Sequence, residues 1–259
     1  MNVSTRLSPT WRIAIVATGC AFLPALAQAT PTTTYWAPST ATCQAKGVPH
    51  VTYDTYFGST SGAGYPIDTG ITIGVLPGDK VQAEVGYDLL LPGSDPTLFF
   101  LNAKVCLTEN TLFKGGPSVS FGFYSIGFEA DKTDYNHWHL MFQKSLPWCG
   151  YVAGGLYHGL STPLFTNSDG DVVKTGAMFG ATSPDIKIGI KGLDKIVIAG
   201  DIQTCKNVFG AGGIGASFYF NDKIAVLTGP VFFLDKALQP GGVSTMWTVQ
   251  LDVDIPLGK

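Results

Sequence analysis

The chain has 259 residues, a formal net charge of −3 and a hydrophobic content of 45%. This apolar content excludes an intrinsically disordered chain, because such chains lack the hydrophobic residues needed to form a core. The weakly acidic balance provides no basic patch, which is what binding of nucleic acid requires. We therefore expect a folded protein that has no nucleic-acid partner.

The first 29 residues have the features of a cleavable secretory signal peptide. Arg6 and Arg12 give a positively charged start, Ile13–Leu26 is apolar, and Ala-Gln-Ala at 27–29 matches a cleavage site. The apolar run is shorter than the roughly 18 residues that indicate a transmembrane helix. A lipoprotein signal at residues 17–20 is the alternative, but cleavage there would leave a very short apolar region. We predict export through the inner membrane, followed by removal of this segment.

The next segment, residues 30–47, is rich in threonine and proline and has no hydrophobic period. Proline interrupts strand pairing, so this segment does not extend the first strand. We predict a flexible or loosely docked periplasmic N-terminal segment that precedes a barrel domain at 48–259.

Four cysteines remain after cleavage, namely Cys43, Cys106, Cys149 and Cys205. They allow three pairings, but the predicted strands place them far apart, and we expect them to be mostly unpaired. The sequence has no CxxC or CxxCH motif, which argues against a c-type haem, a thioredoxin-like site and a zinc ribbon. We predict no cofactor and no metal.

The clearest strand pattern lies at Val243–Ile255, near the C-terminus. Apolar residues dominate its odd positions and polar residues its even positions, and a period of two places these sets on opposite faces of a strand. The segment is longer than the usual strand of about 5–6 residues and reaches the roughly 9–11 residues that a tilted membrane strand needs. Similar patterns predict further strands at His50–Phe57, Ile67–Leu76, Val81–Leu91, Leu98–Leu107, Ser118–Gly127, Asn136–Leu146, Tyr151–Leu160, Lys174–Ile190, Ile196–Cys205, Ala211–Phe220 and Ile224–Leu234.

The predicted connections alternate between tight turns and longer loops. Tight turns lie at Pro77–Lys80, Pro147–Gly150, Gly192–Lys195 and Asn221–Lys223, and Thr108–Pro117 is the one long connection on that side. Short turns at one rim and longer loops at the other are typical of outer-membrane barrels with both termini in the periplasm.

Because no stretch after the signal peptide is a candidate transmembrane helix, a membrane-spanning form of this chain must be a closed barrel. A soluble sandwich would have shorter strands, and a propeller would show blade repeats of about 40–45 residues, which are absent. We predict an all-β protein, a closed antiparallel transmembrane β-barrel of twelve strands with up-and-down topology.

The signal peptide and the twelve long amphipathic strands resemble those of Gram-negative outer-membrane β-barrel proteins of the porin-like or small-channel kind. The resemblance covers about residues 48–259 and is one of architecture, so it transfers no functional residue. One departure is that the chain ends in Pro-Leu-Gly-Lys at 256–259, whereas many such barrels end in an aromatic residue. The resemblance implies location in the cell outer membrane and contact with its lipid.

Aromatic residues near the predicted strand ends fit the interfacial girdles of a membrane barrel. The residues expected there are Tyr56, Phe57, Tyr87, Phe99, Phe100, Tyr135, Trp138, Trp148, Tyr157, Tyr219, Phe220, Phe232 and Phe233.

Charged residues at membrane depth on the lipid face cost about 2–4 kcal/mol, so the polar face of each strand must line the interior. The predicted lumen-lining residues are Asp54, Asp68, Glu84, Asp88, Lys104, His137, His139, Asp201, Gln250, Asp252 and Asp254. The same reasoning turns Asp185 and Lys187 of the predicted strand at 174–190 inward, together with Lys191 directly after it. Carboxylates outnumber lysines in this set, and acidic rings favour cations.

We therefore predict a porin-like channel for passive diffusion of small polar solutes, with a preference for cations or neutral molecules, and no enzymatic activity. The alternative is a non-conducting structural or interaction barrel, such as the sheath of a surface or electron-transfer complex. Homo-oligomers and surface-complex partners are compatible with either function.

A lipid hydrolase is a further alternative, with His137 or His139 as base and Ser120 or Ser145 as nucleophile. The sequence has no GxSxG motif, and strand parity turns both histidines away from lipid. Two histidines at i and i+2 could also bind a metal if a carboxylate joined them. Polar lumen residues in a hydrogen-bonded network explain the same pattern.

Overall fold

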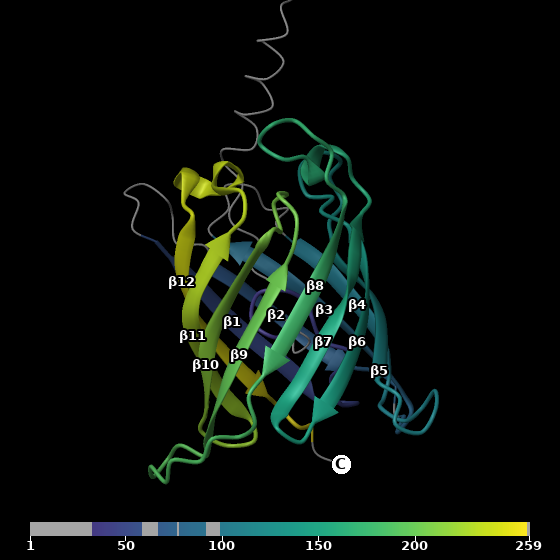
Figure 1. Ribbon diagram of the computed structural model, residues 1–259, viewed down its shortest axis with the longest axis vertical. Helices are drawn as coiled ribbons and strands as arrows, with labels where there is room; N and C mark the ends of the chain where they lie inside the picture. The colour runs from purple at the N-terminus through teal and green to yellow at the C-terminus, as the bar shows by residue number, and fades with distance from the viewer. Residues whose placement is uncertain (1–32, 59–66, 77, 92–98, 258–259) are drawn as a thin grey trace, which may run out of the picture.

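The computed structural model describes residues 33–58, 67–76, 78–91 and 99–257, and the predicted signal peptide lies outside them. Twelve strands form a closed barrel in which every neighbouring pair is antiparallel and β12 pairs with β1 (Figure 1). The predicted fold class is therefore confirmed. The strands are β1 (Pro49–Phe57), β2 (Ile67–Gly74), β3 (Val81–Leu91), β4 (Phe99–Leu107), β5 (Ser118–Ile126), β6 (His137–Leu146), β7 (Cys149–Gly159), β8 (Thr175–Thr182), β9 (Lys195–Gln203), β10 (Ala211–Tyr219), β11 (Ile224–Phe233) and β12 (Thr245–Asp254).

The barrel closes through the strand with the clearest sequence pattern. In the β1–β12 register, His50 lies opposite Asp254 and Phe57 lies opposite Trp247. β1 therefore begins, and β12 ends, at the same rim, which we call the terminal rim; the opposite end is the far rim. In β1, buried residues alternate with less buried ones along the strand, as expected when one face points into a closed barrel.

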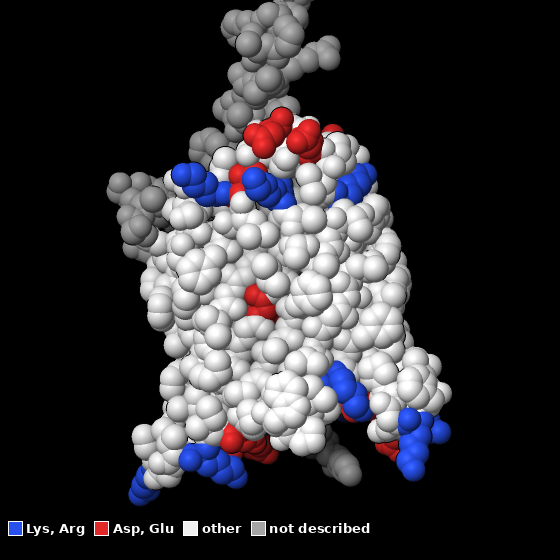
Figure 2. All heavy atoms as spheres, viewed as in Figure 1, with Lys and Arg blue, Asp and Glu red and all other residues white. Residues whose placement is uncertain are grey.

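The outer surface is apolar between two charged ends. Figure 2 shows the lysines and acidic residues of one face gathered near the two rims, with a broad uncharged band between them that is interrupted by one acidic residue near mid-height. Large apolar side chains stand exposed on this surface, including Val105, Phe121, Phe179, Ile214 and Trp247. A patch of this extent is unusual on a soluble monomer, because it leaves apolar area in water. None of the helices among the described residues is long and apolar enough to cross a membrane.

One strand is much shorter than predicted. β8 ends at Thr182, and residues 183–194 form a long connection at the terminal rim instead of a strand that reaches 190. Pro184 has no N–H to donate to a neighbouring strand, which explains why regular pairing stops here. The side chain of Asp185 is 51% exposed and forms an ion pair with Lys195, so the prediction that 185, 187 and 191 line the lumen was wrong.

The N-terminal segment contributes to the interior of the barrel. The sequence indicates a loosely docked segment, yet Tyr35, Trp36 and Ala37 are 2% exposed or less. Residue 46 then forms a parallel bridge with Gly74 of β2 before β1 begins. We call residues 33–47 the plug. Its sequence lacks a period because it follows the inner wall as irregular chain, which a periodicity argument does not detect.

Several predicted girdle aromatics belong to this interior instead. Tyr56, Phe100, Tyr135, Tyr157 and Phe233 are buried in one cluster that also contains Tyr35 and Trp36 of the plug. Trp36 makes edge-to-face contacts with Tyr56 and Phe233 at ring-centroid distances of 5.8 and 5.5 Å. For the four that lie in strands, Tyr56, Phe100, Tyr157 and Phe233, parity and not nearness to a strand end decides which way the ring points. Tyr135 lies in the connection between β5 and β6.

The expectation that the cysteines are mostly unpaired was wrong for two of the four. Cys43 of the plug forms a disulfide with Cys106 of β4, across a sequence separation of 63 residues. Cys149 and Cys205 are free. The pairing could not be predicted because it depends on the plug lying inside the barrel.

Candidate functional site: the lumen and its plug

A single carboxylate on the inner wall holds the first part of the plug. Asp201 of β9 accepts backbone N–H groups from Tyr35, Trp36 and Ala37 at 2.9 Å each, and the Ser39 hydroxyl at 3.0 Å. Hydrogen bonds to an ionised acceptor are stronger than neutral ones. Four donors that would otherwise be buried without a partner thus converge on one side chain.

Small residues on the wall make room for the plug. Cβ atoms built at Gly213 and Gly215 of β10 would lie 2.4 and 2.5 Å from ring atoms of Tyr35. The Tyr35 hydroxyl donates to the carbonyl of Pro230 at 2.9 Å, and the indole N–H of Trp36 donates to the carbonyl of Phe209 at 3.1 Å. The glycines of this strand therefore allow a close approach of an aromatic ring to the wall.

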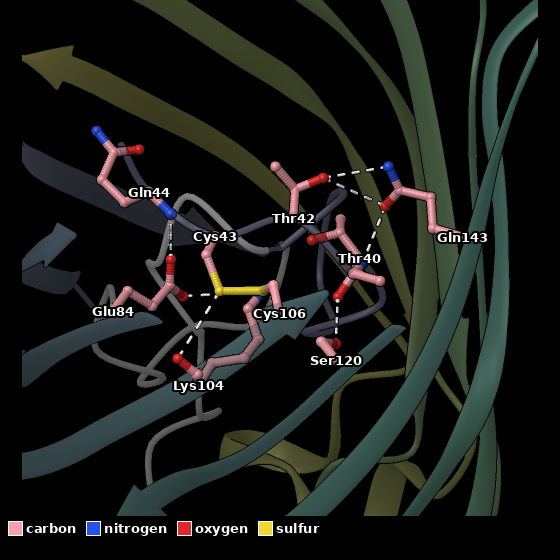
Figure 3. The surroundings of a disulfide bond; sticks show 10 residues. Thr40, Thr42, Cys43, Gln44, Glu84, Lys104, Cys106, Ser120 and Gln143 are labelled. Atoms are coloured by element: carbon pink, nitrogen blue, oxygen red, sulfur yellow. Dashed lines mark hydrogen bonds and ion pairs between the residues drawn. A yellow bond between two sulfur atoms is a disulfide. The ribbon is translucent and has the colours of Figure 1, made fainter. Parts of the chain in front are cut away.

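The second part of the plug crosses to the opposite wall (Figure 3). The backbone N–H of Ala41 donates to Gln143 of β6 at 2.9 Å, and Ser120 of β5 donates to the carbonyl of Thr40 at 3.2 Å. Beyond the disulfide, the N–H of Gln44 donates to Glu84 of β3 at 2.6 Å. The plug is thus fixed to strands on both sides of the lumen.

A methyl group at Gly180 tests the docking of the plug directly. A Cβ there would lie 2.6 Å from Ser39 Oγ and 2.7 Å from Thr34 Oγ1, both of which belong to the plug. We expect Gly180→Ala to weaken plug docking by about 1–3 kcal/mol, the usual cost of overpacking, and to expose the plug to protease. Limited proteolysis followed by mass spectrometry measures this.

The matched control is Gly154→Ala, because a Cβ at that position would first meet the outward-facing ring of Phe179 at 3.3 Å. Equal cleavage of the plug in both variants would contradict the assignment of Gly180 as a docking position.

The predicted lumen residues lie at inward positions of the strands. Nine of the eleven are buried: Asp54, Asp68, Glu84, Asp88, Lys104, His137, His139, Asp201 and Gln250. The other two, Asp252 and Asp254, have side-chain exposures of 32% and 35% and lie near the terminal rim. Two of them, Lys104 and Glu84, form an ion pair at 3.8 Å. Both rim aspartates contact a further inward residue, His50 of β1.

Several buried polar atoms of the inner wall have no hydrogen-bond partner among the described residues. They are Asp54 Oδ1, Asp88 Oδ1, Lys104 Nζ, His137 Nε2, both ring nitrogens of His139 and both amide atoms of Gln203. Buried polar groups are almost always hydrogen-bonded to protein or to ordered water. The wall of the lumen therefore provides sites for water that a dry core would not.

The histidines are not arranged for hydrolysis of lipids at the outer surface. His137 and His139 are 0% exposed, and His137 Nδ1 donates to the carbonyl of Tyr135 at 3.2 Å. The hydroxyl of Ser120 is used by the plug. In the part of the chain that the structure describes, no group of three or more His, Cys, Asp or Glu side chains is placed to hold a metal ion.

A cavity of about 250 Å³ lies at the terminal rim. It is bounded by the plug, by β1 and by the strands β10, β11 and β12. Its lining residues are Thr33, Thr34, Gln44, His50, Asp54, Ser217, Tyr219, Asp222, Lys223, Ile224, Ala225, Leu227, Gln250, Asp252 and Asp254. Three of these are predicted lumen residues that lie close together along β12, which brings the acidic residues of the closing strand into one concave site.

Strand parity turns four of the residues that hold the plug inward, namely Glu84, Gln143, Asp201 and Gln250, but it did not indicate that they hold a segment of the chain. Gly180, Gly213 and Gly215 lie against the plug, and small residues at alternate positions of a strand were the available signal for a docked segment. It is a weak signal, because a glycine on a strand can equally mark a bulge or a bend.

The fold and its interior define a closed antiparallel β-barrel whose lumen contains its own N-terminal segment. No family model matches the sequence, and a search of curated proteins found no similar sequence.

Solved barrels are similar in fold at low sequence identity. An outer membrane channel from Pseudomonas putida F1 has a TM-score of 0.49 and 11% identity, covering 88% of this chain and 100% of that one. The OmpF of Salmonella typhi, in complex with daunomycin, has a TM-score of 0.42 and 7% identity, covering 80% and 96%. The translocator domain of the autotransporter NalP from Neisseria meningitidis has a TM-score of 0.41 and 11% identity, covering 96% and 94%. Similarities at this level do not assign the chain to a family.

Proposed function

We propose that this protein is an outer-membrane channel for passive diffusion of small solutes, with a preference for cations or neutral molecules, and that the plug closes its lumen in the described conformation. The observation that carries the proposal is the set of buried polar atoms on the inner wall that have no hydrogen-bond partner among the described residues. Groups of this kind are stable where water reaches them, and a hydrated wall is what a solute pathway needs.

The outer surface supports the membrane location. A closed barrel leaves no unpaired strand edge, which makes it one of the few folds that can span lipid. Apolar side chains such as Val105, Phe121 and Ile214 would contact lipid, while the charged rims would meet the water on each side (Figure 2). In this arrangement the predicted signal peptide directs export through the inner membrane, and the terminal rim lies on the periplasmic side.

The decisive experiment compares the full mature protein with a variant that lacks residues 33–42 in planar bilayers. We expect small and infrequent currents for the full protein and at least a tenfold larger conductance for the variant, because the deletion removes Tyr35 and Trp36 from the lumen. The reversal potential under a KCl gradient then reports selectivity, and we expect a preference for K⁺ because carboxylates outnumber lysines on the inner wall.

Heat-modifiable migration on gels and β-sheet circular dichroism establish that the deletion variant is folded. If it does not fold, Asp201→Asn serves in its place, because it weakens docking of the plug without shortening the chain. A folded variant with an undocked plug and no conductance would overturn the channel proposal, and a clear anion preference would overturn its selectivity.

A non-conducting interaction barrel is the second candidate. The aromatic cluster around Trp36 and the disulfide at Cys43 favour it, because both fill and fix the interior. On this proposal the barrel would display its far-rim loops, including residues 160–174, to a second copy or to a surface-complex partner. Absence of conductance in the folded plug-deleted variant, together with co-purification of a stable partner from outer membranes, would support it.

A further inference from the structure

The cavity at the terminal rim is partly open to solvent and has an excess of negative charge. Its lining contains four carboxylates, from Asp54, Asp222, Asp252 and Asp254, and two basic side chains, from His50 and Lys223. At about 250 Å³ it has room for several water molecules or for one small organic molecule. The plug contributes Thr33, Thr34 and Gln44 to the wall, so the cavity exists because the plug is docked.

His50 already neutralises part of this charge. Its Nδ1 lies 2.9 Å from Asp254 Oδ1 and its Nε2 lies 3.2 Å from Asp252 Oδ1. A neutral imidazole has one N–H group, so contact of both ring nitrogens with carboxylate oxygens requires the doubly protonated ring. Asp254 also accepts the amide of Gln44 at 2.8 Å. The two rim aspartates are therefore largely satisfied by the protein itself.

Asp54 is in a different situation. Asp54 is 1% exposed and lines the cavity. Its Oδ1 atom has no hydrogen-bond partner among the described residues. A buried acceptor without a donor costs about 1–3 kcal/mol. A ligand that enters the cavity and donates a hydrogen bond to Asp54 would remove this cost, and one that is also positively charged would offset the remaining carboxylate charge.

The chemistry of the lining restricts the ligand further. No set of three or more His, Cys, Asp or Glu side chains in the described ranges is placed to hold a metal ion, and the volume exceeds that of one bare ion. The hydroxyls of Thr34 and Tyr219 and the carboxylate of Asp222 lie on the same lining as Asp54, and oxygens of this kind accept hydrogen bonds from an ammonium group.

We propose that this cavity, between the plug and strands β1, β10, β11 and β12, is a binding site for a small organic cation with N–H donors, such as an alkylamine, and that Asp54 receives its ammonium group. The site does not depend on conduction through the barrel, and it would serve equally as the entrance of a channel or as a receptor site.

Titration calorimetry on the detergent-solubilised mature protein tests this, with 1,4-diaminobutane as the probe at constant ionic strength. We expect saturable binding that is at least tenfold weaker in Asp54→Asn and about threefold weaker in Asp222→Asn, which lies at the exposed edge of the site. Asp169→Asn, on a far-rim loop outside the cavity, is the matched control and should bind as the unmodified protein does. Tetramethylammonium, which has the charge but no N–H donor, should bind at least tenfold more weakly than the diamine.

Unchanged binding by Asp54→Asn would overturn the proposal, as would equal binding of tetramethylammonium. If Asp54→Asn does not fold, the Asp222→Asn and tetramethylammonium comparisons decide the question. Calorimetry does not depend on conductance, so the two proposals can fail separately. Binding without current would refute the channel and leave the binding site standing. Current without binding would refute the binding site and leave the channel standing.

Discussion

Replacing Asp201 with alanine is expected to release the plug from the wall of the barrel. The carboxylate accepts the N–H groups of Tyr35, Trp36 and Ala37 and the hydroxyl of Ser39. An unpartnered buried donor costs about 1–3 kcal/mol, so four of them make the docked state unfavourable by about 4 kcal/mol or more. Since the plug can leave the wall while the strands remain paired, the loss should appear as undocking and not as unfolding of the barrel.

The fluorescence of Trp36 measures this undocking. Trp36 is 2% exposed when the plug is docked. In a background with Trp138, Trp148 and Trp247 replaced by phenylalanine, we expect red-shifted emission and several-fold stronger acrylamide quenching in Asp201→Ala. Asp201→Asn should give an intermediate result. Its single amide oxygen can take the place of Oδ2 and keep the hydrogen bonds made there. Its NH₂ group would take the place of Oδ1, which accepts the N–H of Trp36 at 2.9 Å, so that this hydrogen bond would be lost.

The control for Asp201 is Asp185→Ala. It removes an equal charge from the exposed 183–194 connection, where Asp185 contacts Lys195. Similar quenching in this variant would show that the effect of Asp201 comes from net charge and not from its hydrogen bonds to the plug.

Removing the disulfide is the second change with a large expected effect. Cys43 and Cys106 close a loop with a sequence separation of 63 residues, and a cross-link of this span lowers the free energy of the folded state by about 4 kcal/mol relative to the unfolded chain. We expect Cys43→Ser with Cys106→Ser to lower the free energy of unfolding by about this amount, measured by urea denaturation in detergent.

The same double variant should let the plug leave the lumen more often. With the tether gone, only non-covalent contacts such as those to Asp201 and Gln143 hold it, and open events in bilayer recordings should become more frequent. Cys149→Ser is the control, because Cys149 is free. If the double variant and the control have equal unfolding midpoints and equal open probabilities, the disulfide does not stabilise the docked plug.

The sequence was sufficient to predict most of the strands that form the wall of the barrel, because these strands follow a simple rule. Each strand has one face toward the interior and one toward the outside, so inward and outward residues alternate with a period of two. Val243–Ile255 contains the strand that closes the barrel, and its register with β1 places Gln250 opposite Asp54. The same rule turned Asp201, His137 and Lys104 inward.

The rule failed where backbone pairing decided the structure. The apolar pattern at 174–190 continues past the point where regular strand pairing stops, since Pro184 cannot donate to a neighbouring strand. The girdle prediction failed for a different reason, because it placed Tyr56 and Phe100 by their nearness to strand ends, whereas their parity turns them into the buried cluster.

By itself, the sequence determined the all-β class and the number of strands, because these depend on local periodicity. The tertiary structure alone decided that residues 33–47 enter the lumen, that Cys43 meets Cys106, and that Asp54 borders a cavity with the rim aspartates. These features depend on contacts between segments far apart in the chain, such as Tyr35 with Asp201. A segment without hydrophobic period contains no local signal of where it will dock, because its partners exist only once the barrel has closed.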